Sequence, residues 1–484
     1  MTRHKKRANP LGYGVLTLIL GSCFGTVGCN PSHTRVAPQT ALKQLSQPTF
    51  SVPVSDSTPD IKNGSSTWTF FTDEALESAI QRVLRDNLSI VQAASRLKGA
   101  GAARDSADAS YFPSLDLSAS RSKSESFMFG RNIEQDQISV SVAASYELDL
   151  FDKLGGARRA AALEQAATRQ DLEAIRITVS ATYADVWFQH TEALNSVELF
   201  RAQKQTSENF FSITQARFKH GLVTAADVLQ QRQQLEALKT MEAPLNARVQ
   251  LTGHQLRVLE GSVPEASPTD LKRTLPKAIP VSQANISGAR LMRRPDLAAA
   301  RLRIQSIDER VGAALANRLP SFRLSGNIGL GAASFSALFD QWLFSLSASL
   351  VAPIFDGGRR AADVAQQRAV LEQAMHQYRA LYLAAIREVK DALVLAHQED
   401  VRRSRLDVEL ETSRRLLGEV KRRYVSGVGP YSAVLNALQV LQRKERELLT
   451  TRRNQLTHRI SLWRALGGIY TQATTSERQS DSDA

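Results

Sequence analysis

The two halves of this sequence repeat the same series of short motifs, and this duplication limits the possible folds more than any other feature. The matched residues are Pro113 and Pro320, Phe151 and Phe355, Gly221 and Gly427, and Leu259 and Leu466. Each pair is separated by 204 to 207 residues. Because solenoid repeats are only about 20–50 residues long, this period indicates one structural unit built twice.

Each half contains a very long segment without proline. The segments cover residues 155–219 and 358–424, and apolar residues recur in both at intervals of three and four. At about 1.5 Å per residue, the first would form a helix of roughly 95 Å. Gly221 and Gly427 then suit helix C-caps, and a hydroxyl residue starts a new helix after each. The sequence predicts two long antiparallel helical hairpins. A fibrous dimeric coiled coil is the alternative for the helices alone.

Between the helices, the hydrophobic period changes from 3.6 to 2 in both halves. The alternating segments are 115–119, 138–150, 322–330 and 342–354. One face is apolar and the other is small and polar, and the longest segments exceed the roughly nine to eleven residues that cross a membrane at a tilt. Tyr146 and Trp342 are candidates for an interfacial aromatic girdle. Two hairpins of a soluble sandwich are the alternative.

Four strands cannot close a barrel, and an open sheet edge cannot face lipid. Membrane barrels of this kind have at least about eight strands, so three copies would supply about twelve. The predicted fold class is therefore mainly α with a transmembrane β-barrel. Each protomer contributes long antiparallel helical hairpins plus four strands, and the barrel is shared between subunits.

The N-terminus has the layout of an export signal, with a basic start followed by an apolar stretch over 11–27 that is short for a membrane span. A weak membrane anchor is the alternative. Cys23 and Cys29 lie at its end and no cysteine follows, so a structural disulfide is excluded. Both sites approximate a bacterial lipobox. We favour Cys29 as the acceptor of palmitate or another acyl chain because the Pro-rich lead-in starts directly after it, with Cys23 as the alternative.

The duplication and the composition changes divide the chain into six parts. They are a signal peptide (1–28), a lipid-anchored extended lead-in (29–72), a first structural repeat (73–262), a connector (263–287), a second structural repeat (288–468) and a polar tail (469–484).

The charge and the histidines exclude several classes of function. The net charge is +13, but the basic residues are spread along helical faces, so nucleic acid is not an expected partner. The eight histidines form no close ligand pattern, and no phosphate-binding glycine loop follows a strand. We therefore expect no enzyme activity, no cofactor and no metal site.

With these features, the chain resembles the TolC-like outer-membrane efflux proteins, in the lipid-anchored branch often called the NodT or OprM type. The resemblance covers about residues 29–470 and is strong because several motifs occur in order and in duplicate. Besides the two hairpin tips, the motifs are Leu275-Pro276, Ile279-Pro280, Arg293-Arg294-Pro295-Asp296-Leu297, Glu147-Leu148-Asp149-Leu150-Phe151 and the segment 352–359.

The resemblance implies a homotrimeric channel anchored to outer-membrane lipid, with a barrel, a helical tunnel through the periplasm and an equatorial region. It implies export of small molecules, as in multidrug resistance, together with a periplasmic adaptor (membrane fusion) protein and an inner-membrane transporter, commonly of the resistance-nodulation-division class. The outlet of a type I protein secretion system and a lipid-anchored periplasmic coiled-coil scaffold are the alternatives. The residues that would contact the adaptor are Arg217, Phe218, Gly221, Leu222, Thr224, Arg423, Tyr424 and Gly427.

The entrance of the channel departs from the family pattern. Family members often narrow it with acidic residues at positions that correspond here to Ala433 and Asn436. Asp227, in the first tip, is acidic and has two interpretations, a partner of the helix dipole and a gating residue. Without the second-copy carboxylates, we expect weak block of the entrance by cations.

Overall fold

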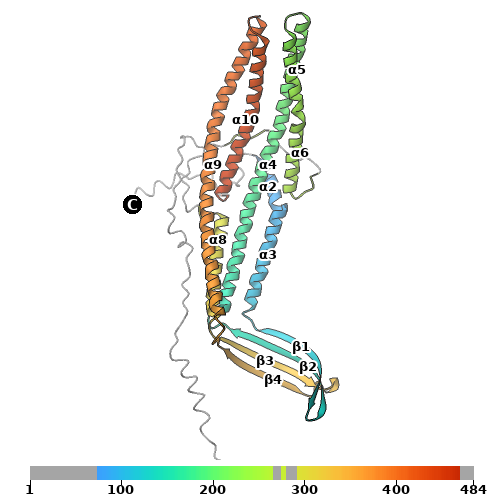
Figure 1. Ribbon diagram of the computed structural model, residues 1–484, viewed down its shortest axis with the longest axis vertical. Helices are drawn as coiled ribbons and strands as arrows, with labels where there is room; N and C mark the ends of the chain where they lie inside the picture. The colour runs from blue at the N-terminus through green and yellow to red at the C-terminus, as the bar shows by residue number, and fades with distance from the viewer. Residues whose placement is uncertain (1–72, 265–273, 279–290, 469–484) are drawn as a thin grey trace, which may run out of the picture. The chain divides into compact units, whose positions relative to one another are not determined.

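The computed structural model describes residues 73–264, 274–278 and 291–468 (Figure 1). The expected signal peptide, lead-in, both cysteines, polar tail and most of the connector lie outside these residues. The elements are α2 (Glu74–Asp86), α3 (Leu88–Ala109), β1 (Ser114–Met128), β2 (Arg131–Leu148), α4 (Lys153–Lys219), α5 (Ala225–Thr240), α6 (Glu242–Leu259), α8 (Pro295–Ala316), β3 (Ser321–Ala332), a short 3₁₀ turn (Phe335–Ala337), β4 (Trp342–Val351), α9 (Arg359–Val425) and α10 (Tyr431–Ala465).

The two long helices have the predicted bounds to within two residues. α4 and α9 contain 67 residues each, and each is followed by a return helix, α5 with α6 in the first half and α10 in the second. The return from the first tip is interrupted at Met241, which follows α5 and precedes α6. Pro244 lies in the first turn of α6, where the missing N–H costs no intrahelical hydrogen bond.

Two compact units divide the chain, and each takes segments from both halves. One unit includes Ala100–Gln165 and Leu302–Met375, and therefore the sheet. The other includes Ala166–Arg301 and the chain from His376 onward, and therefore both hairpin tips. The boundaries of the six sequence segments remain a prediction, because the units follow contacts in space and not the duplication.

The sheet has the antiparallel order β1-β2-β3-β4. Its first hairpin is longer than the alternating segments 115–119 and 138–150 predicted, because both strands continue through the polar residues between them. The strands meet at Phe129 and Gly130, whose φ values of 53° and 78° fit a two-residue hairpin turn. β4 ends at Val351 and not at Ile354, since Pro353 cannot donate to a strand ladder.

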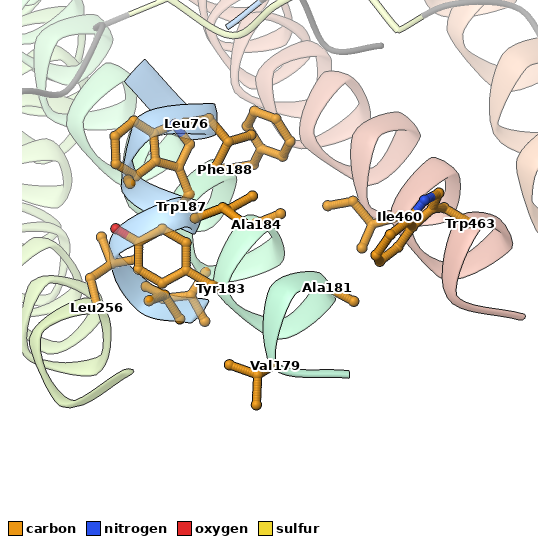
Figure 2. Close-up of a cluster of buried hydrophobic side chains, with 14 of the residues drawn as sticks. Leu76, Val179, Ala181, Tyr183, Ala184, Trp187, Phe188, Leu256, Ile460 and Trp463 are labelled. Carbon is orange, nitrogen blue, oxygen red and sulfur yellow. The ribbon is translucent and has the colours of Figure 1, made fainter. Parts of the chain in front are cut away.

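A buried apolar cluster in the second unit joins helices from both halves (Figure 2). Tyr183, Trp187 and Phe188 of α4 are at most 2% exposed. They share the cluster with Leu76 of α2, Leu256 of α6 and Ile460 of α10. The polar atoms of the large rings have partners, since Tyr183 Oη donates to Glu260 at 2.6 Å and Trp187 Nε1 donates to Asp73 at 3.3 Å. Within the described residues, no helix is both long and apolar enough to cross a membrane.

Candidate functional site

The first hairpin tip lies between α4 and α5 and has a closely defined backbone. Gly221 has φ +72°, and the Leu222 N–H donates to the Arg217 carbonyl at 3.0 Å, which closes the C-terminus of α4. Thr224 then caps α5. These hydrogen bonds define the path of the backbone from α4 to α5.

The second tip, between α9 and α10, repeats the same geometry. Gly427 has φ +74°, and the Val428 N–H donates to the Arg423 carbonyl at 2.9 Å. Pro430 then precedes the first residue of α10. The sequence match between the two tips is therefore also a structural match.

The two tips contact each other through aromatic and cationic side chains. The Arg217 guanidinium lies 4.6 Å from the centre of the Tyr424 ring, and the Tyr424 and Tyr431 rings are 5.4 Å apart. Tyr431 Oη donates to Gln231 Oε1 at 2.7 Å, and burial raises the pKa of this hydroxyl. Arg217 and Tyr424, which the family resemblance predicts in the adaptor contact, therefore join the two halves of the chain.

Four apolar side chains remain exposed at the tips. Phe218 is 46% and Leu222 71% exposed in the first tip, and Val425 is 65% and Val428 70% exposed in the second. Phe218 and Leu222 were predicted from the sequence as contact residues, whereas the two valines were not. Their signal was available, because both valines lie within two residues of Gly427, the glycine that marks the turn. Apolar side chains held outward on a rigid turn are typical of a contact surface for another protein.

The three residues expected at the entrance have different environments. The Asp227 carboxylate accepts hydrogen bonds from the N–H and the hydroxyl of Thr224, at 2.9 and 2.8 Å. This capping box agrees with the interpretation of Asp227 as a partner of the helix N-terminus, and the gating role stays a prediction. Asn436 is exposed and Ala433 is partly exposed on α10.

The faces of the sheet differ as the alternation predicted. Cross-strand register places Val142, Ile328 and Phe344 in one row of the apolar face, and Ser141 in the next row of the opposite face. On the polar face, serine hydroxyls pair across strands, as in Ser118–Ser141 at 2.9 Å and Ser325–Ser347 at 3.0 Å. The apolar face is exposed, with Leu346 at 74% and Phe344 at 60%. Such a sheet is apolar toward lipid and hydroxyl-lined toward water.

The motif around Arg294 lies at the start of α8 and is a buried hub. The Arg294 guanidinium donates to both carboxylate oxygens of Asp296 at 3.1 and 2.8 Å, to Glu388 at 2.9 Å and to the Ala465 carbonyl at 2.8 Å. Burial opposes its charge, but Asp296 and Glu388 hold its pKa above the usual range. A Cβ at Gly467, where φ is +73°, would lie 3.0 Å from Arg294 Cγ. Glycine therefore permits the close approach of α10 to this arginine.

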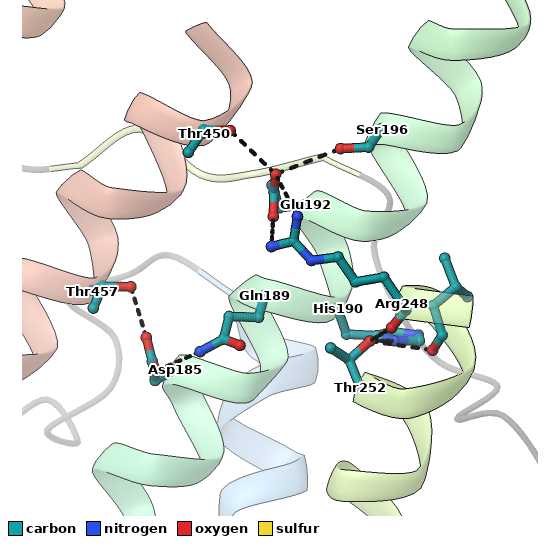
Figure 3. A network of polar contacts seen from close by, with 10 residues as sticks. Asp185, Gln189, His190, Glu192, Ser196, Arg248, Thr252, Thr450 and Thr457 are labelled. Atoms are coloured by element: carbon teal, nitrogen blue, oxygen red, sulfur yellow. Dashed lines mark hydrogen bonds and ion pairs between the residues drawn. The ribbon is translucent and has the colours of Figure 1, made fainter. Parts of the chain in front are cut away.

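A second polar network connects α4 to α6 and α10 (Figure 3). Glu192, which is 2% exposed, accepts hydrogen bonds from Arg248 and from Thr450. Asp185 accepts from Thr457 at 2.6 Å. His190 lies 2.8 Å from the Thr252 hydroxyl, and burial lowers its pKa. The network gives the buried polar groups of α4 hydrogen-bond partners on α6 and α10. It therefore fixes the positions of these three helices relative to one another.

Two features define the class of protein. The sheet has one apolar and one serine-bearing face, and both helical hairpins end in tips with exposed apolar side chains, a combination that fits an outer-membrane channel protein. The comparison with known families agrees, because the model of the outer membrane efflux protein family matches residues 79–262 and 287–468. The chain belongs to this family.

Individual proteins agree with this assignment. The chain is 27% identical over 410 residues to the pyoverdine export outer membrane protein OpmQ of Pseudomonas putida, covering 83% of this chain and 87% of OpmQ. It is 24% identical over 458 residues to the probable outer membrane lipoprotein SilC of Salmonella typhimurium, covering 92% and 96%. The outer membrane protein VceC of Vibrio cholerae has the same fold, with a TM-score of 0.75, 24% identity and coverage of 83% and 98%. The predicted TolC-like fold, efflux function and outer-membrane location are confirmed.

Proposed function

We propose that this protein is the exit duct of a tripartite export system and that it works as a homotrimer. The observation that carries the proposal is the sheet of four strands, whose apolar face is exposed and whose outer strands β1 and β4 have no further strand partner within the described residues. Unpaired strand edges cannot face lipid. Three copies supply about twelve strands, a number within the range of closed membrane barrels.

The hairpin tips are the proposed contact for a periplasmic adaptor protein, which joins the duct to an inner-membrane transporter of the resistance-nodulation-division class. Exposed Leu222 and Val428 supply apolar contact area, and Gly221 and Gly427 hold the turns that present them. In this proposal the tips bind the adaptor and align it with the duct.

Small molecules are the proposed cargo, and Cys29 is the proposed lipid acceptor. Serine hydroxyls line the water-facing side of the sheet and offer neutral hydrogen-bonding groups to polar solutes of many kinds. The export of pyoverdine by OpmQ and the lipoprotein description of SilC support the two parts of this proposal. The outlet of a protein secretion system is the second candidate, and it would use the same barrel.

Placing a carboxylate on the tips tests the adaptor contact. We expect the double variant Leu222→Asp, Val428→Asp to lose at least tenfold in affinity for the adaptor, because desolvating a charge in an apolar contact costs more than about 1.4 kcal/mol. Binding is measured between the purified full-length trimer and candidate adaptors encoded with the transporter. Ser432→Asp is the control, since it adds one carboxylate at an exposed polar position of α10 beside the second tip. Equal affinity of all three proteins would contradict the assignment of the tips.

The entrance residues give a second prediction. Asn436→Asp would place three carboxylates around the entrance of a trimer, and we expect divalent cations to block the variant at a several-fold lower concentration than the wild type. Single-channel conductance in planar bilayers, with added magnesium, measures the effect. Unchanged sensitivity to magnesium would show that Asn436 does not line the entrance.

A further inference from the structure

The β1–β2 hairpin extends well beyond its neighbours. Pairing between β2 and β3 ends at Ile138 with Ala332, whereas pairing between β1 and β2 continues to Met128 with Arg131. At about 3.3 Å per residue, the extension is roughly 23 Å long. It points away from the strand ends that connect to helices, since α3, α4, α8 and α9 all join the sheet at the other end of the strands.

Charged residues replace apolar ones where the extension begins. On the apolar face, Leu115, Leu117 and Ala119 are followed along β1 by charged side chains, and the same change occurs in β2 beyond Ile138. The residues Arg121, Lys123, Glu125, Glu134 and Asp136 share this face, and we name them the charged belt.

The belt lies at the level expected for a membrane surface. The apolar part of β2 runs from Ile138 to Leu148, which corresponds to roughly 33 Å of strand. With a tilt of about 40°, this length spans about 25 Å, the height of the apolar band of an outer-membrane barrel. This inference rests on the proposed function, in which the long helices lie in the periplasm. The belt is at the opposite end of the strands from these helices, and it therefore lies at the outer leaflet.

The belt contains exposed side chains of both charges, which could contact phosphate groups and bound cations. Arg121 forms two hydrogen bonds to Asp136, at 3.2 and 2.7 Å, yet its side chain is 69% exposed. Lys123 lies 3.4 Å from Glu134 and is 59% exposed. Both cations can therefore reach outward. Exposed ion pairs contribute little to stability, so the fold does not require them.

One pair in the belt places two carboxylates opposite each other, with Lys123 as the nearby cation at 3.4 Å from Glu134. Glu125 lies directly opposite Glu134 in the β1–β2 register, and like charges in this position are destabilising. A divalent cation bound between carboxylates and phosphate oxygens would offset the repulsion. The outer leaflet of a bacterial outer membrane consists of lipopolysaccharide, whose phosphorylated headgroups are bridged by such cations.

We propose that the charged belt binds the phosphorylated headgroup of lipopolysaccharide. Arg121 and Lys123 contact phosphate oxygens directly, and guanidinium is the group best matched to phosphate in geometry. Glu125 and Glu134 share a divalent cation with the same phosphates. The belt thereby sets the depth of the barrel in an asymmetric membrane.

The test compares two variants on opposite faces of the same hairpin. Arg121→Gln, Lys123→Gln removes both belt cations. Arg131→Gln removes an exposed cation on the opposite face of the hairpin. Side chains alternate between the faces of a strand, and residue 131 is an odd number of positions from Glu134 and Asp136. Each full-length protein is reconstituted in magnesium-containing vesicles of phosphatidylethanolamine and phosphatidylglycerol, with and without lipopolysaccharide. The measured quantity is the temperature at which trimers dissociate.

We expect lipopolysaccharide to raise this temperature for the wild type and for Arg131→Gln, and to raise it by less than half as much for the double variant. Chelation of magnesium should reduce this increase in dissociation temperature more for the wild type than for the double variant Glu125→Gln, Glu134→Gln. An equal gain in the wild type and the double variant would overturn the proposal. Absence of trimers from every vesicle would instead contradict the shared barrel, so the two failures are distinguishable.

Discussion

Replacing Leu346 by arginine will prevent most of the protein from assembling in the outer membrane. Leu346 lies in the middle of β4 on the apolar face and is 74% exposed, so the variant places a guanidinium in lipid. Near the midplane of a bilayer this costs about 2–4 kcal/mol per site, and a trimer contains three such sites. Val142→Arg, in β2 on the same face, should have the same effect. The measurement is the fraction of protein recovered as trimers from isolated outer membranes.

The control for this prediction is the neighbouring residue. Ser345→Arg places the same side chain one residue earlier in β4, on the face that carries the serine pairs, where a barrel holds water. We expect this variant to assemble at close to the wild-type level. If Leu346→Arg and Ser345→Arg assemble equally well, the apolar face does not meet lipid, and a periplasmic scaffold becomes the better interpretation.

The variant Arg294→Ala will destabilise the region where α8, α9 and α10 meet. It removes four hydrogen bonds and leaves Asp296, Glu388 and the Ala465 carbonyl without their cation. We expect a loss of about 2–3 kcal/mol in the free energy of unfolding, which is the upper part of the range for a hydrogen bond to a charged group. A larger penalty is not expected, because the Glu388 side chain is 46% exposed and water can solvate it. Urea unfolding of the detergent-solubilised protein, followed by tryptophan fluorescence, measures the change.

Two further variants make this prediction specific. Arg293→Ala removes the preceding arginine, which is exposed, and should change the free energy of unfolding by less than about 0.5 kcal/mol. Arg294→Lys keeps the charge but cannot match the two oxygens of Asp296, so we expect it to recover only part of the stability. Equal effects of Arg293→Ala and Arg294→Ala would show that the hub contributes no stability of its own.

Sequence periodicity was sufficient to predict the bounds of the long helices and to assign residues to the two faces of the sheet. α4 and α9 lack proline and keep one apolar stripe over many turns, so their bounds could be predicted closely. The alternation in β2 and β4 assigned Val142 and Leu346 to the lipid side, because the period of a strand leaves only two faces. Both inferences depend on local patterns that neighbouring chain segments do not alter.

Features that depend on long-range pairing could not be predicted in the same way. Lys123 and Asp136 sit in an apparently polar loop, and only their cross-strand pairing shows that β1 and β2 continue there. The stacking of Arg217 on Tyr424 joins residues from different halves of the chain, and no short motif signals it. The role of Arg294 was visible as a family motif, but its contacts with Glu388 and Ala465 required the fold.

The most direct test of the shared barrel is the native mass of the protein extracted from isolated outer membranes, measured by light scattering with correction for bound detergent. The unprocessed chain has a mass of 53.2 kDa. We expect a protein mass close to three protomers, together with the β-sheet signal of a barrel in circular dichroism. A monomer without that signal would contradict both the barrel and the duct function, and it would leave an anchored periplasmic scaffold as the better account of the helices.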